Sequence, residues 1–287
     1  MKCIFNLILS MVLAKSVFAE MVFTHVTPVS DDDRRHDYEI ELLRLSLEKT
    51  VSDFGAYSMQ GAAKMNQARS KASVRQNRYT NLIRTFGYQK DFEYDYNVSY
   101  IPFPIHLGLV GYRVCFIPDA IQQQLSDVKT SDDLLKFLHG QGKSWADVAI
   151  LRYNGFKVTE IAEYESLFKM TAAGRIHLFC RGVNEVMYEY NNYKDMEGLA
   201  LDRAMVIFYP MPRFYYTHKS NTEAIKRISV GLQRAYDDGS LLALWEKHYR
   251  ESINFVQLKG RRFFYFDSPF TQSIEFDYMK YFIQLER

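Results

Sequence analysis

The chain has 287 residues, of which 47% are hydrophobic and 24% are charged. These are ordinary values for a globular protein, and they exclude the disordered and fibrous classes. Lysine and arginine number 36 against 34 aspartates and glutamates. This near balance argues against binding to nucleic acid, which usually requires a basic face.

The first 19 residues have the pattern of a secretory signal peptide. Lys2 supplies a positive start, residues 4–14 form a short apolar run, and Val17-Phe18-Ala19 offers a cleavage site. The run is shorter than the roughly 18 apolar residues of a membrane-spanning helix, so cleavage is favoured over an uncleaved anchor. Removal of residues 1–19 leaves 34 basic and 34 acidic residues in the exported chain.

Short strands alternate with helices in the rest of the chain, which is typical of an α/β fold with mainly parallel sheets. In the first part we predict strands over 21–27, 56–60 and 81–86, and helices over about 34–49 and 64–75. In the second part we predict strands over 112–117, 157–161, 176–180 and 205–209, and helices that begin at about Ser131, Trp145 and Tyr164. Two more helices are predicted from about residues 221 and 240, and the aromatic tail from Gly260 predicts irregular packing over a lobe.

The motifs Pro-Phe-Pro at 102–104 and Pro-Met-Pro at 210–212 bracket the second part of the chain. Proline disrupts both strand ladders and helices, so these stretches suit crossings between two lobes. Two crossings imply a first lobe built from both ends of the chain, residues 20–108 and 208–287 including the tail, with a second lobe inserted at 109–207.

Two cysteines, Cys115 and Cys180, remain after signal cleavage, and both lie in predicted strands. An oxidising compartment would permit a disulfide between them. The sequence does not show that they are close in space, and two separate buried thiols are the alternative that we favour. No pair of cysteines or histidines has the spacing of zinc ligands, so no metal site is predicted.

Several motifs stand out beyond these patterns. They are Gly140-Gln141-Gly142 with Trp145 and Asp147, Arg181-Gly182-Val183-Asn184-Glu185, Asp33-Arg34-Arg35, and Met65-Asn66-Gln67 with Arg69. Together they resemble a subgroup of the family 3 extracellular solute-binding proteins over nearly the whole exported chain. The resemblance implies a two-lobed type 2 periplasmic-binding-protein fold, in which each lobe is a mainly parallel sheet flanked by helices and two hinge crossings join the lobes.

The same resemblance implies a function. We expect a periplasmic monomer without a cofactor that closes around a small polar solute and serves an ABC importer or a membrane sensor. Amino-acid binders of this family place an arginine shortly after the third strand to clamp the α-carboxylate of the ligand. Here residues 89–91 read Gln-Lys-Asp. This departure argues against a standard amino acid, although a carboxylate-bearing solute is still expected.

In open α/β sheets, ligands bind beyond the carboxyl ends of the strands, so turns after strands should carry the site residues. We expect Gly140-Gln141-Gly142 to be a loop that opens a helix, where backbone N–H groups and Lys143 would attract an anion. Arg181 offers a planar fork of donors for a carboxylate, and a pair with Glu185 that only braces the turn is the alternative. The predicted ligand contacts are Arg35, Arg69, Thr85, Phe86, Gln141, Gly142, Lys143, Trp145, Arg181 and Asn184.

The sequence contains no recognisable catalytic motif. No serine lies in a G-x-S-x-G elbow, and no two histidines have the H-E-x-x-H spacing. We therefore expect a binding protein without catalytic residues. One alternative is a dehydratase- or lyase-type enzyme on the same fold, with an acid–base pair that includes Glu185 or Asp147. Another is an exported interaction or sensor module without a transport role, whose cleft is filled by Tyr and Phe side chains.

Overall fold

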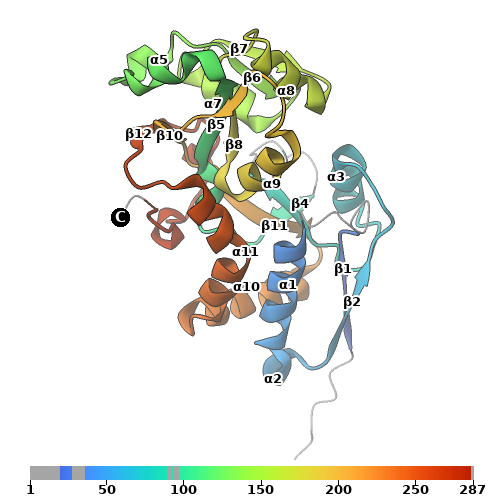
Figure 1. Cartoon of the computed structure of the whole chain (residues 1–287). Coiled ribbons are helices and arrows are strands. Elements are labelled where there is room, and N and C mark those ends of the chain that lie inside the picture. Colours follow the sequence, from blue (N-terminus) through green and yellow to red (C-terminus); the bar gives the residue numbers. More distant parts are fainter. Residues whose placement is uncertain (1–19, 28–35, 89–91, 93–96, 286–287) are drawn as a thin grey trace, which may run out of the picture.

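The computed structural model describes residues 20–27, 36–88, 92 and 97–285, which form two α/β lobes, one above the other in Figure 1. The lower, first lobe contains β1 (Met21–His25), α1 (Asp37–Glu48), α2 (Val51–Phe54), β2 (Tyr57–Gly61), α3 (Gln67–Arg75), β3 (Arg84–Gly87), β4 (Val98–Tyr100), β11 (Arg213–His218), α10 (Thr222–Asp237) and α11 (Ser240–Val256). The upper, second lobe contains β5 (Tyr112–Pro118), α5 (Gln122–Ser126), α6 (Ser131–Leu134), β6 (His139–Gly142), α7 (Ala146–Tyr153), β7 (Val158–Ile161), α8 (Tyr164–Ala172), β8 (Phe179–Gly182), α9 (Val183–Tyr193), β9 (Leu199–Leu201), β10 (Met205–Phe208) and β12 (Arg262–Tyr265).

Both lobes combine parallel and antiparallel strand pairs. In the first lobe, β1 is parallel to β2, whereas β11 is antiparallel to β3 and β4. In the second lobe, β6 and β7 are parallel, whereas β5 is antiparallel to β8, β9 and β10. The sequence predicted mainly parallel sheets. The β1–β2 and β6–β7 sheets are parallel as predicted, whereas β5 and β11, the strands that adjoin the crossings, run antiparallel to their neighbours.

The two crossings between the lobes lie side by side. Ile105 N–H donates to the carbonyl of Arg213 at 3.0 Å, and Ile101 N–H donates to the carbonyl of Tyr215 at 2.8 Å. Gly108 has a φ of 84° in the first crossing, and a Cβ there would lie 2.5 Å from Phe282 Cγ, so only glycine fits. The proline-containing stretches are therefore the two crossings predicted from the sequence.

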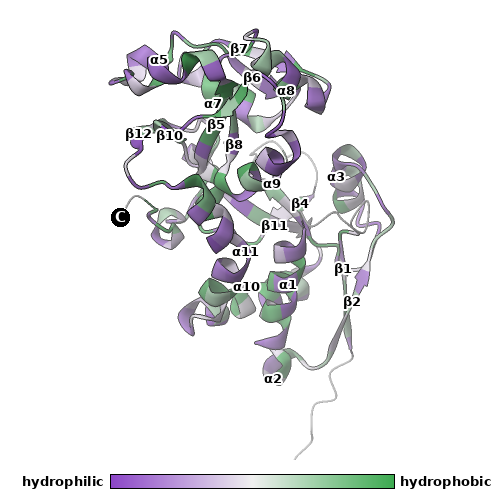
Figure 2. Cartoon of the chain, viewed as in Figure 1, coloured by the Kyte–Doolittle hydropathy of each residue, from purple (hydrophilic) through white to green (hydrophobic). Residues whose placement is uncertain are grey.

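The helices of the first lobe pack through apolar faces. Leu42 and Leu47 of α1 and Ile228 and Leu232 of α10 belong to the same hydrophobic core, and all four are fully buried. A Cβ at Gly231 would lie 1.9 Å from the carbonyl oxygen of a residue in α1, so this glycine lets the two helices approach closely. Figure 2 shows the corresponding pattern in the second lobe, where β5 is mostly hydrophobic and the outer helix α5 carries hydrophilic residues.

Strand β6 contains the Gly-Gln-Gly motif, which was predicted to be a loop that opens a helix. The prediction was wrong because both glycines serve close packing rather than a turn. A Cβ at Gly140 would lie 2.4 Å from Ile176 Cδ1, and one at Gly142 would lie 2.2 Å from Trp145 Cε2. Helix α7 begins only at Ala146, after an exposed turn.

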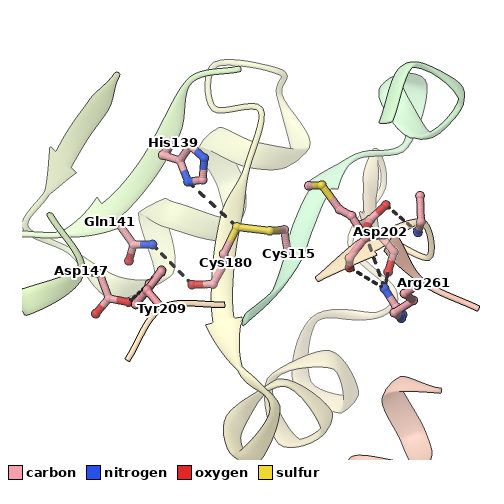
Figure 3. The surroundings of a disulfide bond; sticks show 10 residues. Cys115, His139, Gln141, Asp147, Cys180, Asp202, Tyr209 and Arg261 are labelled. Atoms are coloured by element: carbon pink, nitrogen blue, oxygen red, sulfur yellow. Dashed lines mark hydrogen bonds and ion pairs between the residues drawn. A yellow bond between two sulfur atoms is a disulfide. The ribbon is translucent and has the colours of Figure 1, made fainter. Parts of the chain in front are cut away.

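A disulfide joins Cys115 of β5 to Cys180 of β8, which are directly opposite in the strand ladder (Figure 3). The prediction of two separate thiols was therefore wrong. The register of β5 against β8 brings together two cysteines that are 65 positions apart in the sequence. Both cysteines are buried, and His139 Nδ1 lies 4.0 Å from Cys180 Sγ. The bond thus cross-links two strands in the middle of the second lobe.

The chain after Gly260 packs against both lobes. Strand β12 is parallel to β10 at the edge of the second-lobe sheet, with Phe264 buried. The tail then passes to the first lobe, where Ile283 N–H donates to Leu107 O at 3.0 Å and the Tyr281 ring lies 4.5 Å from that of Phe103. The sequence had assigned this tail to the first lobe as irregular packing, whereas β12 pairs within the second. The lobe boundaries at residues 108 and 207 stay a prediction.

No helix in the described ranges is both long enough and apolar enough to cross a membrane.

We expect Phe264→Ala to lower the free energy of unfolding by about 3 to 5 kcal/mol, because the ring is only 4% exposed and its removal leaves a cavity between β12 and the second-lobe core. Tyr265→Ala is the matched control, since its ring is 52% exposed, and it should cost about 1 kcal/mol or less. Urea unfolding monitored by circular dichroism measures both values. Equal losses would show that β12 does not pack as described.

Removal of the disulfide by a combined Cys115→Ala and Cys180→Ala substitution should lower the free energy of unfolding by about 2 to 4 kcal/mol, because the unfolded chain loses a long cross-link. The same unfolding experiment, run with and without reductant, provides the control. Reductant should destabilise the wild-type protein and leave the double variant unchanged. A double variant as stable as the oxidised wild type would contradict this account.

Candidate functional site

The first lobe presents Arg84 and Thr85 at the carboxyl end of β1. Ile83 N–H donates to Thr24 O at 2.8 Å, and this bond sets the start of β3 beside the last residues of β1. A small cavity of about 10 Å³ lies here, with room for about one water-sized group. It is lined by His25, Val26, Glu39, Ile40, Leu43, Ile83, Arg84, Thr85 and Tyr215.

Arg84, at the start of β3, is a buried arginine. The residue is 8% exposed, and its Nε atom has no hydrogen-bond partner among the described residues. Burial lowers the pKa of Arg84, and the nearby Glu39 acts in the opposite direction. An arginine nevertheless stays protonated in a protein, so this position holds a buried cation.

Glu39 of α1 is the buried carboxylate of the first lobe. Its oxygens lie 2.8 Å from His36 Nδ1, 3.4 Å from Arg213 Nη2 and 3.9 Å from His106 Nε2. Burial alone would raise the pKa of Glu39, but Arg213 and the histidines outweigh it and lower this pKa to about 2. Glu39 is therefore an anion that holds Arg213 in place at the second crossing.

In the second lobe, Arg113 of β5 is 2% exposed and forms a buried ion pair with Asp147 of α7. The distance from Arg113 Nη2 to Asp147 Oδ1 is 2.9 Å, and the Tyr209 hydroxyl donates to the same oxygen at 2.6 Å. Asp147 and Tyr209 lie together near the disulfide in Figure 3. Arg113 thereby joins the central strand to the first turn of α7.

Arg181 of β8 is held by two carboxylates of α9. Its Nε donates to Glu189 at 2.8 Å, and its Nη2 lies 2.9 Å from Glu185 Oε1. The guanidinium also lies 4.6 Å from the centre of the Trp145 ring, and Tyr164 donates a hydrogen bond to Glu189. This geometry matches the alternative in which Arg181 pairs with Glu185 and only braces the turn. Glu189 is a second carboxylate partner that the sequence did not predict. Glu185, with a side chain 36% exposed, is the most accessible of these charged groups.

The other second-lobe residues that were predicted to contact a solute differ in how far they are exposed. Gln141 is fully buried and donates to the Cys180 carbonyl at 3.4 Å, so this conformation does not offer it to a solute. Gly142 lies against the Trp145 ring, and Lys143 is exposed in the turn before α7. Asn184, in the first turn of α9, has a buried Oδ1 atom without a hydrogen-bond partner among the described residues.

The remaining predictions concern the first lobe. Thr85 lines the cavity beside Arg84, whereas Phe86 packs against the rings of Phe92 and Tyr216 in the core. Arg69 is exposed in the first turn of α3, and its backbone N–H donates to the side chain of Asn66. Arg35 lies outside the described residues. The solute contacts proposed for these residues stay predictions.

The charged groups of the two lobes converge on the second crossing. Met211 Sδ accepts a hydrogen bond from Arg113 Nη2 at 2.7 Å, and Met211 Cε would lie 4.0 Å from a Cβ at Gly87. Burial raises the pKa of Tyr249 in α11, and the electrostatic effects of Tyr38, Glu39 and Glu185 raise it further.

Arg84 and Arg113 were missed because we looked for site residues in turns, whereas both lie inside strands. Each interrupts an otherwise apolar strand, in the sequences Ile83-Arg84-Thr85-Phe86 and Tyr112-Arg113-Val114. A charged residue is rarely buried without a partner, so a lone arginine in a buried strand was the available signal. No cluster of three or more His, Cys, Asp or Glu side chains within the described ranges could hold a metal ion.

The Glu39 network predicts a pH dependence of stability. The pKa of Glu39 is lowered from 4.5 to about 2 by folding, so its stabilising effect is present above about pH 4.5 and is lost as the pH falls towards 2. The shift corresponds to about 3 kcal/mol. The stability difference between the wild type and Glu39→Gln should therefore be largest near neutral pH and shrink below pH 4.5.

Urea unfolding at a series of pH values measures this difference, with the exposed Glu163→Gln as the control variant. A difference between wild type and Glu39→Gln that does not change with pH would show that Glu39 is not held as an anion.

No family model and no curated protein matches the sequence. Solved structures do match the fold. A Bacillus subtilis protein is 18% identical, with a TM-score of 0.55 over 81% of this chain and 91% of that chain. A Salmonella typhimurium periplasmic binding protein with high arginine specificity is 14% identical, with a TM-score of 0.54 over 80% of this chain and 100% of that chain.

A structure from work on glutathione import through the cystine ABC importer of Streptococcus mutans is also similar, at 14% identity and a TM-score of 0.54 over 81% of this chain and 96% of that chain. At such identities the likeness bears on the fold and not on the ligand. It confirms the architecture expected from the sequence motifs. The chain therefore has the two-lobed type 2 periplasmic-binding-protein fold.

Proposed function

We propose that this protein is an exported, periplasmic solute-binding protein, which closes its two lobes around a small polar solute that carries a carboxylate. It would pass the solute to an ABC importer or report its presence to a membrane sensor. The fold supports a binding role, since similar structures include an arginine-binding protein and a protein of glutathione import. The ligand itself must be argued from the residues of this chain.

The observation that carries the proposal is the convergence of buried charged groups from both lobes on the second crossing. Arg213 and Glu39 approach it from the first lobe, and Arg113 approaches it from the second through Met211. Ligand sites commonly combine an interdomain position with a few fixed polar groups. The ion pairs here fix the positions of polar groups in each lobe beside the second crossing.

The paired crossings support a closing motion. Two short segments joined to each other by backbone hydrogen bonds can absorb a rotation while each lobe stays rigid. A solute that touches both lobes favours the closed state by the difference in its affinity for the two states. The starts of α7 and α9 would bring Lys143, Trp145 and Asn184 to the solute from the second lobe, and Thr85 would meet it from the first.

The pairing of the carboxylates also favours binding over catalysis. Asp147 and Glu185 were the residues named for an acid–base pair, and each is held by at least one buried arginine. Asp147 is 5% exposed, so it is not available to a substrate in this conformation.

A thermal-shift screen of the chain from Glu20 onward, with amino acids, organic acids, sugars and small peptides, tests the proposal. A solute that binds the native state should raise the melting temperature by mass action, by several degrees at saturation. Small-angle X-ray scattering should then show a smaller radius of gyration with the solute than without it. A well-folded protein that responds to none of these compounds would contradict a role in solute binding.

A further inference from the structure

We infer that the second lobe carries a site for a phosphate group, apart from the region between the lobes. The site is a pocket of about 440 Å³ where three segments meet, namely the end of α5, the start of β10 and the turn that leads from α11 into β12. It is lined by Ser126, Ala204, Gly260, Arg261 and Arg262. The inference rests on the position of the pocket, on its one fixed guanidinium and on its surplus of positive charge, and it does not depend on the proposed function.

The pocket lies at the end of the second-lobe sheet away from the second crossing. Strands β10 and β12 are parallel, and the pocket residues Ala204 and Arg262 lie where the two strands start. Phe208, at the other end of β10, leads into the second crossing. Arg262 N–H donates to Ala204 O at 2.9 Å. Arg203 N–H donates to the side chain of Gln122 in α5 at 3.3 Å. These bonds hold the three segments together, and a ligand bound here leaves the space between the lobes free.

Arg261 is the fixed guanidinium of the pocket. Its side chain is only 5% exposed. Its Nε donates to Val256 O at 2.9 Å, and its Nη1 donates to Asp202 O at 2.7 Å (Figure 3). Its Nη2 has no hydrogen-bond partner among the described residues, although a guanidinium can donate from all three nitrogens. Because Arg261 lines the pocket, this remaining nitrogen is available to a ligand there.

Two further arginines add positive charge to the pocket. Arg203 and Arg262 are exposed, and neither side chain forms a hydrogen bond or ion pair with the described residues. Lys259, just before the turn, is also exposed. Burial lowers the pKa of Arg261, Asp202 acts in the opposite direction, and the like charge of Arg203 lowers this pKa further. Arg203 is therefore close enough to Arg261 for the two cations to repel each other, and an anion between them would relieve this repulsion.

The acidic residues beside the pocket do not neutralise these cations. Asp202 is fully buried, and it accepts hydrogen bonds from the Gln122 side chain at 3.1 Å and from the N–H groups of Ala204 and Met205, both at 3.0 Å. Asp127, at the end of α5, is exposed and accepts a hydrogen bond from a glutamine of the same helix. The basic residues of the pocket outnumber these two carboxylates, so a surplus of positive charge remains.

A phosphate group fits this combination better than a carboxylate. Guanidinium groups bind phosphate oxygens through pairs of hydrogen bonds. A phosphate presents its oxygens in several directions and can meet guanidinium groups from separate segments at once, whereas the two oxygens of a carboxylate lie in one plane and suit one guanidinium. The lining has no aromatic side chain and no aliphatic side chain larger than that of Ala204, so it suits a charged group and not an apolar body. Inorganic phosphate and the headgroup of an anionic phospholipid both carry this chemistry.

Calorimetric titration with inorganic phosphate at constant ionic strength tests the site. The wild type should bind phosphate saturably, and the combined Arg203→Gln and Arg262→Gln variant should bind it at least about tenfold more weakly, because each lost charged hydrogen bond costs that much or more. Both positions are exposed, so the variant should remain folded by circular dichroism. The combined Arg44→Gln and Arg175→Gln variant is the matched control, since it loses the same charge at exposed positions outside the pocket, and it should bind as the wild type does.

Vesicles distinguish the two sources of phosphate. Cosedimentation with phosphatidylcholine vesicles, with and without phosphatidylglycerol, should show binding that requires phosphatidylglycerol and Arg203 with Arg262 if the ligand is a lipid headgroup. Binding of inorganic phosphate without binding to either vesicle would identify a free phosphate compound as the ligand. A wild type that binds neither inorganic phosphate nor the vesicles would overturn the site. Equal weakening in the two combined variants, or none in either, would also overturn it.

Discussion

The free-energy cost of burying charge governs the region between the two lobes. An ion removed from water must be compensated by a partner and by hydrogen bonds, or it destabilises the fold. Arg113 and Arg181 of the second lobe meet this requirement through Asp147, Glu185 and Glu189. These pairs fix the directions of the side chains at the starts of α7 and α9. These ion pairs thereby hold the charged side chains of the second lobe in fixed positions.

The disulfide joins the two strands that carry these arginines. Cys115 lies two residues after Arg113, and Cys180 immediately precedes Arg181, so the bond holds β5 and β8 in the register that places Arg113 opposite Gly182 and Arg181 opposite Val114. A shift of one residue between these strands would turn each side chain to the opposite face of the sheet. The disulfide and the ion pairs of Arg113 and Arg181 therefore both hold this part of the second lobe in place.

Much of the architecture follows from sequence patterns, because strands, helices and proline-rich crossings are specified locally. The central strand β5 and the helices α10 and α11 lie close to their predicted ranges. Features that depend on contacts between residues far apart in the sequence could not be predicted from it. The register of Cys115 against Cys180, the parallel pairing of β12 with β10, and the contact of Arg181 with Glu189 depend on how separate segments meet.

The Gly-Gln-Gly motif, which was wrongly predicted to be a loop, shows a second limit of prediction from sequence. Glycine indicates either a special backbone conformation or a lack of space for a side chain, and the sequence does not distinguish the two. At Gly140 and Gly142 the reason is space, because the Ile176 and Trp145 side chains occupy the positions of the absent Cβ atoms. The predicted site was therefore sought in a turn, while the charged groups that face the crossings come from within strands.

The segment after Gly260 has a consequence for the order of folding. It supplies the edge strand of the second-lobe sheet and aromatic rings to the core of the first, yet it is synthesised after every residue that it covers. Until it arrives, β10 has an open edge and both cores have exposed apolar surface, which are features that promote aggregation. Neither lobe can reach its final stability during synthesis of the earlier residues. The pairing of β12 with β10 also joins segments far apart in sequence, and such contacts slow folding.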